Sequence, residues 1–206
     1  MEEVNFVVRW GHLVFGITWV GMLYYFNFVQ GSYFKSASPE GLIDAKAKLA
    51  PNALWWFRWA AMLTFVTGLY LISYLGTTFK SNDYIMLGAF MGTVMFMNVW
   101  LVIWPAQRVA LGMKKGNGAA AGAKALLASR TNVLFSGPML YMMLASAHKK
   151  HLADGADTGF FVTLGIIIVL ELNGLLGKQG PLSSISGVIG CSIGLTASLA
   201  AILHFV

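Results

Sequence analysis

Four histidines are the side chains of this sequence best suited to chemistry: His12, His148, His151 and His204. Imidazole is a standard axial ligand of haem iron, and a histidine inside an apolar span is a functional candidate because such residues are uncommon there. Two histidines on facing helices would hold a b-type haem without any cysteine. We therefore take His12, His148 and His204 as candidate cofactor or metal ligands.

Small residues beside two of these histidines leave room for a flat ring system. Gly16 lies about one helical turn from His12 on the same face, so we include it in the candidate cofactor site. Ala200 lies on the face of His204 in the same way. Helix packing is the competing explanation, because small residues also let helices approach closely. We favour packing in the last apolar segment, where small residues recur every four positions: Ser186, Gly190, Gly194 and Ser198.

The fourth histidine, His151, forms a polar group with His148, Lys149 and Lys150. A plain interpretation of this group is a polar cap at the membrane surface, because ionisable residues are rare deeper in a bilayer. We favour that interpretation for His151. Copper is a weaker alternative to haem, since the sequence has no Met-His or Cys-His cluster that would select it.

A carboxylate and two amides form a second candidate set. Glu171 lies within an apolar segment, Asn173 follows it, and Asn98 is expected at a similar depth in another segment. A carboxylate buried in lipid tends to stay protonated unless it is paired. The three residues are either part of a proton path or an interhelical hydrogen bond worth about 0.6–2 kcal/mol, and the sequence leaves both open.

The elements that must position these residues are membrane helices. The 206 residues are 57% hydrophobic and 11% charged, whereas soluble domains carry about 25% charged residues. A bilayer crossing needs about 20 apolar residues, and every backbone group in lipid must be hydrogen-bonded within the protein. We predict an all-α integral membrane protein, a single polytopic domain over residues 1–206 with about six transmembrane helices. Their expected ranges are 6–29, 54–77, 84–104, 132–148, 158–177 and 183–204.

The segments between these spans are expected to be loops, of which residues 30–53 and 105–131 are the longest. Pro105 is predicted to end the third span because it lacks a backbone donor. Residues 107–115 could form a short basic helix at the interface, and residues 119–129 a second helix that leads into the fourth span. The basic residues of this connection are either topology charges, which we favour, or a docking surface for a partner or an anionic lipid.

Lysine and arginine residues predict the orientation of the spans. The connections after the first, third and fifth spans carry nine of them, and the opposite side carries four. We expect the side with nine to be cytoplasmic, so that both termini and all four histidines face the periplasm of a bacterial inner membrane. Arg58 is expected to extend from its span toward the surface. This topology explains the net charge of +6 without nucleic-acid binding.

Several function classes are excluded by what the sequence lacks. Cys191 is the single cysteine, so an internal disulfide framework and a c-type haem on this chain are ruled out. There is no Walker-type loop and no Gly-x-Gly-x-x-Gly nucleotide motif.

Several short motifs, taken together, are typical of one known family. They are Trp10-Gly11-His12, Gly16–Gly21, Tyr25-Phe26-Asn27, Leu54–Trp59, Asn98-Val99, Ile103–Arg108, Ser129–Asn132, Gly137-Pro138 and Met143–His148. In order and spacing, over roughly residues 5–150, they resemble the N-terminal membrane domain of bacterial membrane-bound urate oxidases (urate hydroxylases).

The resemblance implies a polytopic membrane domain that is followed by a c-type cytochrome domain. A protein of this family would oxidise urate and pass electrons to the respiratory chain. His12 and His148 fall on the resembling segments, whereas His204 does not. The sequence departs from the family at two points. It ends at Val206, so we expect the cytochrome domain to be absent, and Thr131 stands where the family tends to have a histidine.

We weigh two main hypotheses. The preferred one is an electron-transfer subunit in the lipid bilayer, which binds a b-type haem near the periplasmic face and passes electrons to a separate c-type cytochrome or a larger membrane complex. The alternative is a cofactor-free structural or assembly subunit. A urate-oxidising enzyme that needs a separate cytochrome is less favoured, and so is a small transporter, whose sole support would be Glu171.

Overall fold

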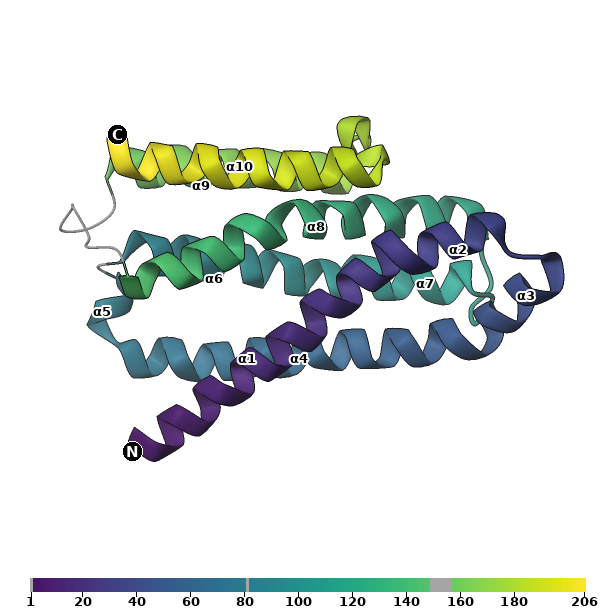
Figure 1. Cartoon of the computed structure of the whole chain (residues 1–206), viewed down its shortest axis with the longest axis horizontal. Coiled ribbons are helices and arrows are strands. Elements are labelled where there is room, and N and C mark those ends of the chain that lie inside the picture. The colour runs from purple at the N-terminus through teal and green to yellow at the C-terminus, as the bar shows by residue number, and fades with distance from the viewer. Residues whose placement is uncertain (1, 81, 149–156) are drawn as a thin grey trace. The chain divides into compact units, whose positions relative to one another are not determined.

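A computed structural model describes residues 2–80, 82–148 and 157–206 of the chain, and in these ranges every regular element is a helix (Figure 1). The all-α prediction is therefore confirmed. The first helical run consists of α1 (Glu2–Tyr24), the π-helix η1 (Tyr25–Gln30) and α2 (Gly31–Ser36). The second consists of α3 (Pro39–Asp44), the π-helix η2 (Ala45–Leu49) and α4 (Ala50–Leu75).

The segment 30–53, predicted to be a loop, is largely helical. The helix is interrupted only at residues 37 and 38. Ser38 then starts the next helix, because its side chain accepts a hydrogen bond from the backbone N–H of Gly41 and Pro39 occupies the first helical position. Hydropathy limits the length of the apolar stretch but does not end a helix. Helix-forming polar residues continue it, supported by the Lys48–Asp44 ion pair four residues apart, with N and O 2.5 Å from each other.

The third run also extends beyond its predicted end. It contains α6 (Asp83–Met97), the π-helix η3 (Asn98–Ile103) and α7 (Trp104–Ala110), and is preceded by the short α5 (Thr77–Lys80). Pro105 was predicted to end this span, but the helix runs on to Ala110. Pro105 lies inside this continuous run, just after the π-helix η3, and the altered hydrogen-bonding pattern of a π-helix accommodates a proline there. The predicted interfacial helix over 107–115 is correspondingly short and ends at Ala110.

The remaining helices begin at side-chain caps. Asn117 accepts from the N–H of Ala120 at the start of α8 (Gly118–His148), and Asp157 accepts from Phe160 at the start of α9 (Thr158–Leu176). Ser184 does the same for α10 (Ile185–Phe205), which follows the 3₁₀ turn η4 (Gly180–Ser183). The predicted spans 158–177 and 183–204 agree with α9 and α10, and the predicted helix over 119–129 is the first part of α8.

Five of the described helical runs are long and apolar enough to cross a membrane: Glu2–Ser36, Pro39–Leu75, Asp83–Ala110, Thr158–Leu176 and Ile185–Phe205. The chain is therefore a multi-pass membrane protein. Five of the six predicted spans are confirmed. The fourth predicted span, 132–148, lies in α8, which is not apolar enough to be counted with them. α8 instead carries a buried polar run from Ser129 to Asn132 and a proline, Pro138, in its interior.

The chain forms two compact units. Unit 1 comprises Met1–Thr67 and Phe96–Ser129, and unit 2 comprises Gly68–Met95 and Arg130–Val206. In unit 1, α4 packs against the third run in antiparallel register. The rings of Phe65 and Phe96 stack at 4.1 Å, and those of Trp59 and Trp100 lie 5.7 Å apart.

Unit 2 is built on close approach at small residues. A Cβ placed on Gly174 of α9 would collide with the Thr131 side chain of α8. Similarly, a Cβ on Gly137 of α8 would lie 2.5 Å from Oγ of Ser192 in α10. A side chain larger than hydrogen cannot occupy either position without movement of its neighbour, so these glycines set the spacing of α8, α9 and α10.

The packing face predicted for the last helix is wrong within this chain. Ser186, Gly190, Gly194 and Ser198 are all exposed, and a Cβ on Gly190 or Gly194 would meet nothing within 4 Å. The buried residues of α10 are Val188, Ser192 and Leu199 instead. The four-residue repeat of small side chains does not show which face of α10 is buried. The face that contains Ser192 packs at Gly137 of α8 instead.

Candidate functional site

His12 is half-buried in unit 1 and is oriented by α4. Its Nδ1 lies 3.0 Å from Oγ1 of Thr67. The Thr67 hydroxyl donates its single hydrogen to the backbone, 2.6 Å from the Leu63 carbonyl oxygen, so it accepts from Nδ1–H of His12. The lone pair of the neutral ring is then on Nε2. Metal-bound histidines are commonly held in this way through their other nitrogen, and the arrangement therefore fits a ligand.

Gly16, the predicted cofactor neighbour of His12, faces the same helix. A Cβ on Gly16 would be 3.9 Å from Cγ2 of Thr64, which is an ordinary packing distance. Thr64 itself is buried, and its hydroxyl donates to the Ala60 carbonyl at 2.7 Å. The space beside Gly16 is thus bordered by α4, which is the packing explanation of a small residue. A cofactor role for Gly16 stays a prediction.

His148 and His204 lie near the C-terminal ends of α8 and α10 in unit 2. Arg130 of α8 donates to the Ser184 carbonyl, and Gly137 of α8 faces Ser192 of α10. From the first pair to the second, the residue number increases in both helices, so α8 and α10 run parallel. Extending this register brings His148, the last residue of α8, level with His204 near the end of α10. Figure 1 shows both helices ending on the same side of unit 2.

Both of these histidines are exposed and have local partners. Nδ1 of His148 lies 3.0 Å from the Leu144 carbonyl oxygen. A carbonyl can only accept, so Nδ1 carries the hydrogen, and Nε2 of the neutral ring has the lone pair. The His204 ring contacts the ring of Phe205, with centroids 4.6 Å apart.

Ligand sets larger than a pair are not formed by the described residues. Across 2–80, 82–148 and 157–206, no three histidine, cysteine or acidic side chains are placed to hold a metal ion. A copper site would need such a set, so the described residues do not provide one. Haem needs one or two axial ligands and is compatible with the observed placement. His151, with Lys149 and Lys150, lies outside the described residues.

The predicted polar set is divided between the units. Asn98 begins η3 in unit 1 and is buried, whereas Glu171 is half-buried on α9 in unit 2. Asn173 is exposed, and its side-chain amide donates to the Lys178 carbonyl at 3.4 Å, just beyond the end of α9. This bond gives Asn173 a local role at a helix end. The proton path through these residues stays a prediction.

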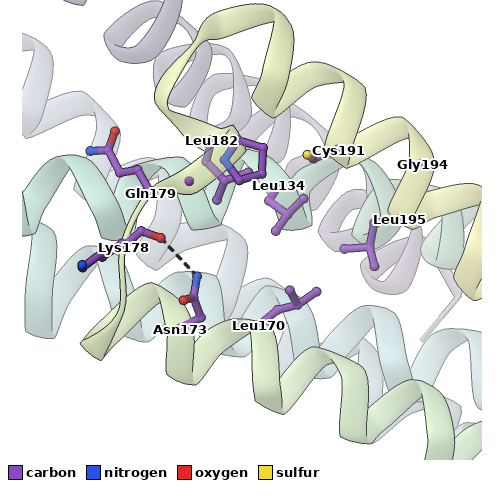
Figure 2. Close-up of a pocket in the computed structure, with 11 residues that line it drawn as sticks. Leu134, Leu170, Asn173, Lys178, Gln179, Leu182, Cys191, Gly194 and Leu195 are labelled. Atoms are coloured by element: carbon purple, nitrogen blue, oxygen red, sulfur yellow. Dashed lines mark hydrogen bonds between the residues drawn. The ribbon is translucent and has the colours of Figure 1, made fainter.

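An open cavity of about 540 Å³ lies in unit 2 between α8, α9 and α10 (Figure 2). Its walls are mainly apolar, with Leu134, Leu170 and Leu195 among the lining side chains. The Asn173–Lys178 hydrogen bond lies at one side, as the dashed line in Figure 2 shows. The cavity holds none of the candidate histidines.

The structure also joins two arginines that sequence reasoning treated separately. The guanidinium carbon of Arg58 in α4 lies 3.9 Å from the centroid of the Trp104 ring, and that of Arg108 lies 5.4 Å from the same ring. Arg58 was expected simply to extend toward the surface. One signal was present, because Trp100, Trp104 and Arg108 follow one another at intervals of four residues and share a helix face.

Comparison with known proteins confirms the resemblance noted in the sequence. Residues 77–172 match the model of the family described as urate oxidase N-terminal. The match includes Asn98, Trp104, His148 and Glu171 and extends past the expected limit near residue 150. It begins only at residue 77, so the resembling motifs before that residue, including His12, lie outside it, as does His204. No curated protein and no solved structure matches the chain significantly.

Proposed function

We propose that this chain, which carries a urate oxidase N-terminal family domain over residues 77–172, is a membrane subunit that binds a b-type haem and transfers electrons. The observation that carries the proposal is the parallel register of α8 and α10, which brings His148 and His204 to one level. Both rings are exposed, so a cofactor can reach them.

The residues fit the group in their hydrogen bonding. His148 donates Nδ1–H to its own helix, so Nε2 is the nitrogen that would bind iron. His12 presents Nε2 in the same way in unit 1, held by Thr67, and is the third candidate ligand. When bound, a haem supplies a one-electron redox centre whose potential depends on its axial ligands.

The proposed location and partners follow from charge. The excess of lysine and arginine in the connections after the first, third and fifth spans supports a bacterial inner membrane protein with both termini in the periplasm. His148 and His204 would then lie near the periplasmic face. A separate c-type cytochrome or a larger membrane complex on that side would accept the electrons.

A reduced-minus-oxidised visible spectrum and a pyridine haemochrome assay on the purified chain test the proposal. We expect a b-type signal near one haem per chain, lost in His148→Ala and in His204→Ala. His12→Ala measures whether unit 1 contributes. His151→Ala is the matched control, because it removes a neighbouring histidine to which no role is assigned. Full haem content in all three ligand variants would overturn the assignment.

A cofactor-free structural subunit is the alternative, and the local partners of the exposed histidines favour it. His148 is bonded to Leu144, and His204 contacts Phe205, as expected of polar residues at a membrane surface. Absence of both haem and metal from the purified chain would support this alternative. A third assay, urate turnover with an added cytochrome acceptor, tests the activity that the family's name describes.

A further inference from the structure

Two positive charges of unit 1 meet at one aromatic ring. The guanidiniums of Arg58 and Arg108 both lie against Trp104, at 3.9 Å and 5.4 Å from its centroid. The indole face attracts a cation, but two like charges beside one ring repel each other. The arrangement therefore calls for a negative group that can interact with both.

The protein does not supply that negative group from the residues that the structure describes. Helix α4 and the whole segment 98–129 contain no aspartate or glutamate. Neither Arg58 nor Arg108 forms an ion pair with a described acid, and the Nε atom of each is buried without a hydrogen-bond partner there. Asp44, an acid of the preceding helix, is engaged by Lys48.

The position of the two arginines is that of a membrane surface. Trp55, Trp56 and Trp59 surround Arg58 along α4, and all three are exposed. Tryptophan is enriched where lipid headgroups meet the hydrocarbon. Arg108 lies near the end of its helical run, two residues before Ala110. The pair is thus expected at the depth of the phospholipid phosphates.

We propose that Arg58 and Arg108, stacked about Trp104, form a binding site for the phosphate of an anionic phospholipid. The planar guanidinium presents paired donors that match phosphate geometry, and basic sites between membrane helices bind anionic headgroups. Both arginines are half-buried, so a headgroup can approach from the bilayer. A free phosphate ion shares the chemistry and is distinguished by experiment.

Lipid titration of the delipidated full chain in mild detergent tests this site. Binding of short-chain phosphatidylglycerol and phosphatidylcholine is measured by native mass spectrometry. We expect preference for phosphatidylglycerol and a loss of about tenfold or more in its affinity in the R58Q/R108Q variant. The matched control is K114Q/K115Q, which removes two solvent-exposed charges from the following turn and should weaken binding by about twofold or less, because exposed charges are screened.

Three results would overturn the proposal: an equal loss in the two double variants, equal binding of both lipids, or displacement of phosphatidylglycerol by an equal concentration of inorganic phosphate. If R58Q/R108Q does not fold, R58K/R108K decides the question. That variant keeps both charges but loses the planar donors, so we expect a partial loss. Unchanged affinity in it would count against the paired-donor geometry.

Discussion

Among the described residues, buried polar atoms without a hydrogen-bond partner occur in both units but are more numerous in unit 1. In unit 1, several buried nitrogen or oxygen atoms have no hydrogen-bond partner among the described residues: those of Trp19, Gln30, Arg58, Trp100 and Arg108. In unit 2, Oγ1 of Thr163 is such an atom as well, but a fully buried amide on α8 is bonded to the chain itself, since Asn132 donates to the Met95 carbonyl at 3.0 Å. Leaving a buried polar atom unbonded costs free energy.

The comparison indicates which groups of each unit are available to bind a ligand. Unit 2 uses its polar groups to hold helices together, and its exposed histidines lie at one end of that framework. Unit 1 instead presents donors that its own residues do not satisfy, which is consistent with an outside partner such as a lipid phosphate. The predictions that follow test this contrast, beginning with the largest expected effect on stability.

Gly174→Ala should clearly destabilise the packing of α9 on α8 in unit 2. The added methyl group would collide with the Thr131 side chain, and overpacking of this kind costs about 1–3 kcal/mol. We expect a clear fall in the midpoint of thermal unfolding in detergent. Gly190→Ala is the control, because nothing lies within 4 Å of its added Cβ; there alanine should be neutral or stabilising, by up to about 1 kcal/mol. Equal behaviour of the two variants would contradict the proposed helix spacing.

Asn132→Ala should be the next largest effect, because it removes a buried bond between α8 and the end of the α6 segment. The amide is fully buried and donates to Met95. We expect a loss of about 1–2 kcal/mol in unfolding free energy. Asn173→Ala removes the same side chain at an exposed site of the same unit and should cost a few tenths of that amount. A larger effect at Asn173 would show that unit 2 is not held by its buried amides.

Trp104→Leu should affect unit 1 more modestly. The substitution removes the ring that two guanidiniums share, and each such contact at a half-exposed site is worth about 0.5–1 kcal/mol. Thermal unfolding measures the change. Trp55→Leu is the control, since Trp55 is exposed and has ring contacts with other tryptophans but none with an arginine. If the two variants are equally stable, the arginines do not depend on Trp104 for their position.

Thr67→Val should have the smallest effect on stability, but it should change which ring nitrogen of His12 carries the hydrogen. Without the hydroxyl, Nδ1 of His12 loses its acceptor. We expect nitrogen NMR of ¹⁵N-histidine-labelled protein to show a smaller Nδ1–H population at His12. Thr18→Val is the matched control on α1, because the Thr18 hydroxyl bonds only to its own helix, at Val14. An unchanged His12 signal in Thr67→Val would refute the assigned tautomer.

Several features of the fold could be read from local sequence. Caps such as Asp157 and Ser184 mark the starts of α9 and α10 close to the predicted positions. Hydropathy identified all five runs that could cross a membrane. The prediction failed at Pro105, because a proline ends a helix only when the preceding turns cannot accommodate it.

The candidate site was less accessible to sequence reasoning. The candidate histidines were recognised from residue type, but the bond between His12 and Thr67 joins residues 55 positions apart. The arginine pair at Trp104 was missed because Arg58 lies on a different helix from Trp104 and Arg108. No local pattern records which ring a distant guanidinium will face.

The sequence by itself determined the class of protein and the approximate positions of its five apolar spans, since hydropathy and capping act over a few residues and depend on local composition. The tertiary structure decided which face of each helix is buried. Gly137 and Gly174 illustrate this, because glycine is needed at these positions only where Ser192 and Thr131 of neighbouring helices approach them closely. It also decided which charges meet, since such contacts depend on how the helices pack rather than on the order of residues along the chain.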